Sequence, residues 1–142
     1  TKGSWPGDDA DRPLDGEGEA QALALRRALE PAGVGRLLSS PTTRCVQSLE
    51  PLAAATGRPV EVLPVLDTDG AGGELRKWLV HEAEDGDVLC THGETMLRLL
   101  DDLADDAPRI EFDADLLAKG TFWELDIDDG RVRAITHRVP AV

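Results

Sequence analysis

The sequence predicts an α/β fold built on a largely parallel sheet, and three observations lead to this class. Helical hydrophobic patterns alternate with short apolar runs along most of the 142 residues, the order expected of parallel strands joined by crossover helices. Glycine, proline or aspartate bounds these short runs, as is typical of strands. The length suits one hydrophobic core, so we expect residues 1–142 to form a single domain.

The first half of the chain predicts a loop, a helix, a strand and a second helix. The opening segment shows no period and predicts a loop. Alanine and leucine then recur at helical spacing over residues 17–30, where Asp15 suits the N-cap. A short apolar run at 36–39 predicts a strand. Ser40 then suits the N-cap of a helix that ends before Gly57.

The second half continues the alternation and closes with a hairpin. We expect strands at 60–63 and 87–91, helices at 74–84 and 94–103, and a hairpin joining 121–127 to 131–138. The hairpin is expected because an Asp-Gly turn separates two runs of alternating apolar and polar residues.

The length of the opening loop indicates that a strand comes before it. Fifteen residues of loop ahead of the first helix have little reason to exist unless a strand precedes them. In open α/β sheets a strand usually leads. We therefore expect the sequence to begin just after the first strand of its sheet, which would be missing from it.

Composition and charge exclude several classes of function. The net charge is −13, so the chain is not expected to bind a nucleic-acid backbone or an anionic membrane surface by bulk attraction. No apolar run approaches the ~20 residues of a membrane span, and the N-terminus has no apolar signal segment. We expect a cytoplasmic protein whose two cysteines, Cys45 and Cys90, are reduced and buried as small apolar groups.

Two side chains with phosphate-binding chemistry follow predicted strands. Arg44 falls in the first turn of the helix after the 36–39 strand, and His92 follows the 87–91 strand. Carboxyl ends of parallel strands share one edge, where ligands of such sheets bind. A helix N-terminus and a guanidinium both bind anions. On spacing alone, Arg44 as a surface arginine and His92 as a structural histidine remain open alternatives.

The order of these motifs resembles a known family. Residues 39–48, SSPTTRCVQS, followed by THGE at 91–94, resemble the histidine phosphatase superfamily, whose fold is phosphoglycerate-mutase-like. The RPL segment at 12–14 and KGT at 119–121 resemble its SixA-type branch. A similar domain ends some MutT-type Nudix hydrolases. The resemblance covers essentially the whole chain and implies a three-layer α/β/α fold.

The resemblance also implies a mechanism. Members of this family transfer a phosphoryl group to a histidine in an R-H-G or R-H-A motif, and water then releases phosphate. By motif, Arg44 matches a phosphate-binding arginine and His92 the second histidine of the site. Arg12 matches the R-P-L arginine, which binds the phosphate or ties its loop to Asp8 or Asp9. The implied activity needs no metal or cofactor, and the implied substrates are phosphohistidine proteins or small phosphate compounds.

The chain departs from the family in lacking any R-H-G or R-H-A motif. Its other histidines, His81 and His137, are expected to be solvated or structural. The resemblance places the nucleophile a few residues before Thr1. Two alternatives to a phosphatase stay open: an accessory domain of a Nudix-type nucleotide hydrolase, and a phosphate-binding or interaction module without catalysis. No residue matches a general-acid motif, and the pattern predicts no oligomeric state.

Overall fold

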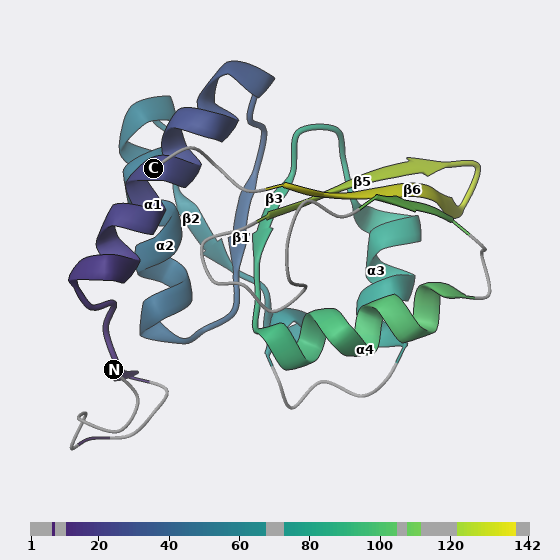
Figure 1. Ribbon diagram of the computed structural model, residues 1–142, viewed down its shortest axis with the longest axis horizontal. Coiled ribbons are helices and arrows are strands. Elements are labelled where there is room, and N and C mark those ends of the chain that lie inside the picture. The colour runs from purple at the N-terminus through teal and green to yellow at the C-terminus, as the bar shows by residue number, and fades with distance from the viewer. Residues whose placement is uncertain (1–6, 8–10, 68–72, 105–107, 112–121, 139–142) are drawn as a thin grey trace.

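The computed structural model describes residues 7, 11–67, 73–104, 108–111 and 122–138 (Figure 1). The helices are α1 (Gly16–Leu29), α2 (Thr43–Thr56), α3 (Glu74–Glu82) and α4 (Gly93–Leu103), with short 3-10 turns η3 (Glu30–Ala32) and η4 (Pro64–Leu66). The strands are β1 (Leu37–Ser39), β2 (Val60–Val62), β3 (Val88–Cys90), β4 (Arg109–Glu111), β5 (Phe122–Asp128) and β6 (Arg131–Arg138). The predicted α/β class is confirmed. The predicted KGT motif and the loop residues Asp8 and Asp9 lie outside the described residues.

The described strands form two sheets of three strands rather than one. Sheet A has the order β2-β1-β3 and is fully parallel, with Leu38 of β1 in register with Glu61 and Leu89. Sheet B has the order β4-β6-β5, in which β4 runs parallel to β6 and β5 antiparallel to it. The largely parallel character predicted for the sheet therefore holds for sheet A. Strand β4 was not predicted, because three exposed residues provide no apolar alternation.

The strand β1 separates two parts of the core. Leu37 packs in one cluster with Leu49 and Leu52 of α2, whereas Leu38 packs in another with leucines of α3 and α4 and with Ile135 of β6. Successive residues of a strand face opposite sides of its sheet. Figure 1 shows the corresponding layers, with α1 and α2 on one side of sheet A and α3 and α4 on the other.

Of the two predicted helix N-caps, the one for α1 is found and the one for α2 is not. The side chain of Asp15 accepts a hydrogen bond from the amide of Gly18 at 2.8 Å, so this predicted N-cap of α1 is confirmed. The predicted N-cap of α2 at Ser40 is wrong, because Thr42 holds that position. The amide of Ser40 bonds the carbonyl of Cys90 at 3.0 Å, so β1 ends at Ser39 as expected, but the helix begins only at Thr43.

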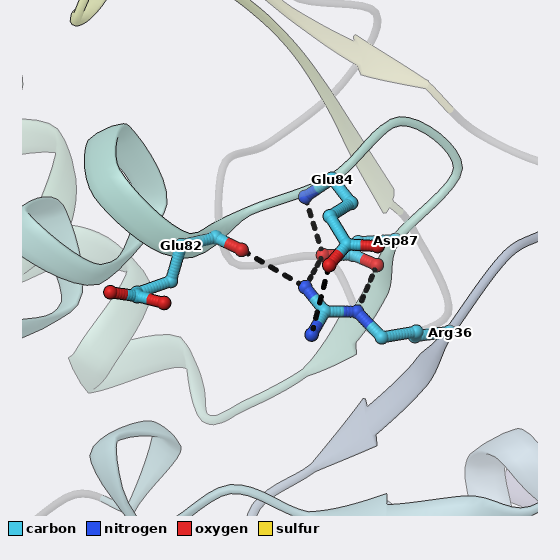
Figure 2. Close-up of polar contacts among 4 residues, drawn as sticks. All are labelled: Arg36, Glu82, Glu84 and Asp87. Carbon is cyan, nitrogen blue, oxygen red and sulfur yellow. Dashed lines mark hydrogen bonds and ion pairs between the residues drawn. The ribbon is translucent and has the colours of Figure 1, made fainter.

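A charged cluster holds the amino ends of β1 and β3 together (Figure 2). The Arg36 guanidinium donates to both carboxylate oxygens of Asp87, at 2.9 and 2.6 Å, and to the carbonyl of Glu82 at 3.1 Å. The chain turns into β3 at Gly86, whose φ of +85° is unfavourable for other residues. A Cβ there would lie 2.8 Å from the carbonyl oxygen of Gly33. This end of sheet A is thus closed by short, charge-matched contacts.

The predicted hairpin is confirmed, and it buries one of the histidines. Asp129 and Gly130 form its turn with φ of 53° and 71°, as two-residue hairpin loops require. His137 of β6 is fully buried and stacks on Trp123 of β5, with ring centroids 4.4 Å apart. The structure thus shows His137 as a packing residue of the hairpin and His81 exposed on α3. No helix within the described ranges is long and apolar enough to cross a membrane.

Candidate functional site

The structure brings Arg44 and His92 together at the carboxyl edge of sheet A. Strands β1 and β3 are adjacent and parallel, with Ser39 in register with Cys90, so the segments that follow them emerge side by side. Arg44 lies in the first turn of α2, and His92 is the N-cap of α4. The Nη2 atom of Arg44 lies 3.4 Å from Nδ1 of His92. Two groups separated by 47 intervening residues of sequence thus face one another.

The hydrogen bonds around His92 determine which of its ring nitrogens carries the proton. A guanidinium can only donate, so Nδ1 of His92 accepts from Arg44 and the ring proton sits on Nε2. Nε2 lies 3.0 Å from Oγ of Ser40, which therefore accepts from it. Oγ1 of Thr42 lies 3.0 Å from the same serine oxygen. The imidazole is fixed at both nitrogens, and its proton-bearing nitrogen is held by a fully buried serine.

Two helix N-termini meet at the same place. Helix α2 begins at Thr43 and α4 at Gly93, and neither N-cap side chain makes a capping hydrogen bond in the part of the chain described. The first backbone amides of a helix lack intrahelical partners, and the helix dipole makes this end positive. The local field at this edge therefore favours an anion, although the chain as a whole carries a charge of −13.

Gln47 ties the segment of Arg12 to this region. The Gln47 side chain accepts a hydrogen bond from the amide of Leu14 at 2.7 Å. Gln47 is three residues beyond Arg44 on α2, and residues at that spacing share a helix face. Arg12, two residues before Leu14, is thus carried on a segment anchored to the face of α2 that bears Arg44. Its phosphate contact stays a prediction.

The two cysteines lie directly behind these groups. Cys45 follows Arg44 in the first turn of α2 and is buried, and its Sγ lies 3.9 Å from the carbonyl of Thr91. A hydrogen bond from Cys90, with others from Thr42 and Ser40, lowers the pKa of the Cys45 thiol to about 5 despite its burial. Both cysteines are free thiols, as expected, but only Cys45 is buried, whereas Cys90 was expected to be buried and is partly exposed.

Sequence reasoning missed three of the residues that build the site. Ser40 was interpreted as a helix cap, although it orients His92. Gln47 belonged to the recognised motif but had no assigned contact, and Cys45 was expected to be an inert apolar group. Their roles depend on neighbours far away in sequence, so only the spacing of the 39–48 motif could have signalled them. Among the described residues, no group of three or more His, Cys, Asp or Glu side chains could hold a metal ion.

The chain resembles known proteins in its sequence. The family model described as "Histidine phosphatase superfamily (branch 1)" matches residues 2–69. An 8-oxo-(d)GTP phosphatase of Mycolicibacterium smegmatis is 30% identical over 141 residues, which cover 96% of this chain and 44% of the relative. The chain thus spans less than half the length of that relative.

Two solved structures show the same fold. One is the protein histidine phosphatase SixA complexed with tungstate, with a TM-score of 0.71 and 21% identity over 91% of this chain and 85% of that one. The other is a putative phosphohistidine phosphatase SixA from Agrobacterium tumefaciens, with a TM-score of 0.59 and 23% identity over 70% of this chain and 68% of that one. At these identities the likeness establishes the fold, which is that of the SixA structures.

Proposed function

We propose that this chain is a phosphatase domain of the histidine phosphatase superfamily and that it works through a phosphohistidine intermediate. The observation that carries the proposal is the 3.4 Å approach of Arg44 to His92 between two helix N-termini. Phosphoryl transfer needs positioning and positive charge above all. This edge of sheet A supplies both from the residues described.

The proposed roles follow from the donors available. The Arg44 guanidinium can donate to two phosphoryl oxygens at once, which a point charge cannot do. Nδ1 of His92 donates to a third oxygen once it carries a proton, while Ser40 holds Nε2. The first amides of α2 and α4 add partial positive charge at the same point. Charge that develops on the phosphoryl oxygens is therefore met by groups already in position.

We assign the nucleophile to a further strand beside β3. Within the described ranges β3 pairs with β1 alone, and sheet B is separate from it. The apolar residues Val88 and Leu89 of β3 are only half-buried. A parallel strand along this side would end at the same edge as His92. A histidine at its end would attack phosphorus from beside Arg44, and the leaving group would depart on the opposite side. The sequence motif expected there is the R-H-G or R-H-A that residues 1–142 lack.

Trapping of the phosphoenzyme tests this proposal. The full-length protein is incubated with p-nitrophenyl phosphate and quenched in alkali, which preserves phosphohistidine, and the labelled peptide is then mapped. We expect phosphate on a histidine N-terminal to residue 1 and none on His92. Turnover should be the same with and without EDTA, because the proposed site uses arginine and histidine. Label on His92, or turnover that needs a metal, would contradict the proposal.

A second candidate is a nucleotide-clearing role. The observation that favours it is the 30% identity with an 8-oxo-(d)GTP phosphatase across 96% of this chain. In this case the domain would act on nucleotide phosphates, as part of a longer protein. Competition between a phosphohistidine peptide and 8-oxo-dGTP in one reaction decides between the two substrate classes. A domain that binds both but turns over neither would be a phosphate-binding module.

A further inference from the structure

Both cysteines of this sequence lie behind the anion-binding pair, although they are 45 residues apart. Cys45 is next to Arg44 at the start of α2, and Cys90 is the last residue of β3, two before His92. The Sγ of Cys45 lies 3.9 Å from the carbonyl oxygen of Thr91, the residue after Cys90. Cys90 packs against the apolar cluster that contains Leu49, and Leu49 lies one helical turn after Cys45 on α2, so both cysteine side chains lie between β3 and α2.

The surroundings favour a thiolate on Cys45 rather than on Cys90. Cys45 occupies the first turn of a 14-residue helix, where the dipole favours negative charge. It receives hydrogen bonds from Cys90, Thr42 and Ser40 and faces His92, which lower the pKa of its thiol to about 5. The same contact and its own burial raise the pKa of the Cys90 thiol. The pair thus consists of a nucleophilic thiolate and a neighbouring thiol.

We propose that Cys45 and Cys90 form a site of reversible oxidation, at which a hydroperoxide converts the two thiols into a disulfide that disables the Arg44–His92 site. The loss of activity rests on the proposed phosphatase function, whereas formation of the disulfide does not. Cys45 is 4% exposed, so the oxidant is expected to be small, such as hydrogen peroxide.

The chemistry balances in two steps. The Cys45 thiolate attacks one peroxide oxygen, the O–O bond breaks, and the departing oxygen takes a proton from solvent to leave as water. Cys45 is then a sulfenic acid. Cys90 next attacks the Cys45 sulfur and gives up its proton, and the S–O bond breaks to release a second water. Two thiols lose two electrons in total, and the peroxide gains them.

The disulfide between Cys45 and Cys90 would displace Arg44 and His92 through the backbone. A disulfide holds its sulfurs about 2.05 Å apart, well inside the separation of two thiols in contact. Its formation draws the first turn of α2 toward the end of β3, and Arg44 and His92 lie one and two residues from the bridged positions. It also removes the thiolate to which Ser40 and Thr42 donate. A displacement of about 1 Å in such a site costs about tenfold to a hundredfold in rate.

Titration of the reduced, full-length protein with hydrogen peroxide tests the inference. We expect the intact mass to fall by two hydrogens without dimer formation, and peptide mapping to join residue 45 to residue 90. Turnover of p-nitrophenyl phosphate should fall about tenfold or more, and dithiothreitol should restore it. Affinity for inorganic phosphate, measured by calorimetry, should weaken in parallel.

Two matched variants separate the steps. C90S should stop at the Cys45 sulfenic acid, which dimedone traps, and should form no bridge. C45S should form neither product. If either variant folds poorly, alkylation of the peroxide-treated parent protein still tests for the disulfide, because its formation removes both thiols together.

The outcomes distinguish this inference from the proposed function. A protein that, after treatment with hydrogen peroxide, still hydrolyses p-nitrophenyl phosphate and keeps both thiols open to alkylation would overturn the inference and leave the function intact. So would a bridge that changes neither turnover nor phosphate affinity. A bridge that weakens phosphate binding in a protein without turnover would support the inference and count against the phosphatase.

Discussion

The two ends of sheet A each present an arginine, in opposite settings. At the amino end, Arg36 makes contacts of 2.6 and 2.9 Å with Asp87, a carboxylate whose side chain is 4% exposed. At the carboxyl end, Arg44 approaches the imidazole of His92 at 3.4 Å. Short contacts between opposite charges hold strands together, whereas two groups that both favour anions, placed side by side, form a binding site. The same residue type thus serves stability at one end and ligand binding at the other.

The largest effect on this contrast is expected from Arg44. R44A should lower turnover of p-nitrophenyl phosphate by about 10²-fold or more, because it removes a donor aimed at charge in the transition state. R44K should recover only part of the loss, since an ammonium cannot hold two oxygens in a fixed fork. Thermal unfolding of both variants should stay close to the parent. Activity of R44A near that of the parent would remove Arg44 from the mechanism.

A smaller loss is expected from Ser40, with Ser39 as its matched control. Both serines are fully buried, but only Ser40 holds Nε2 of His92, whereas the Ser39 hydroxyl donates to a backbone carbonyl. S40A should lower turnover by about tenfold, because one buried hydrogen bond worth roughly 1–1.5 kcal/mol is left unmade. S39A should lower stability by a similar amount and leave turnover per folded molecule unchanged. Equal losses of turnover in the two variants would show that the effect is structural.

At the opposite end, substitution of Arg36 should affect stability alone. R36M keeps much of the aliphatic side chain but removes the hydrogen bonds to Asp87 and leaves that carboxylate nearly buried without its partner. The Tm should fall, while kcat per folded molecule should match the parent. A change in kcat at temperatures where R36M is fully folded would show that the two ends of sheet A are coupled.

The smallest expected effect is a pH dependence centred on Asp87. Burial opposes ionisation of this carboxylate, but hydrogen bonds from Arg36 and the Glu84 amide outweigh it and lower its pKa below the ordinary 3.8. Because the folded pKa is depressed, the resulting stability is fully present above the unfolded pKa and is lost as pH falls through the folded pKa. The difference in unfolding free energy between the parent and D87N should therefore shrink as the pH falls below about 4. A difference that stays constant down to pH 2–3 would contradict this account.

The sequence predicted the elements well because their signals are local. The cap at Asp15 and the Asp129-Gly130 turn each depend only on residues that are close in sequence. The proximity of Arg44 and His92 could also be predicted, because parallel strands end at one edge. Ser40 was misplaced as a cap, since its amide bonds the carbonyl of Cys90, fifty residues away, and the helix begins only after Thr42.

The arrangement of strands and the cysteine pair lay beyond local patterns. Division of the strands into two sheets depends on which edges find partners, and no periodicity encodes this. Cys45 was expected to be inert because cysteine is usually an apolar core residue. Its acidity depends on hydroxyls and a thiol that only the fold brings together.

The hydrogen bond between Leu14 and Gln47 has a consequence for motion. It fastens the segment that precedes α1 to the third residue after Arg44, so a shift of the first turns of α2 must carry that segment with it. Arg12 and Arg44 would then travel together as substrate enters and product leaves. The Leu14 amide is a direct reporter of this coupling, because its hydrogen exchanges with solvent only when the bond to Gln47 opens. Slower exchange of this amide in the presence of inorganic phosphate would show that ligand binding holds the segment of Leu14 more firmly on α2.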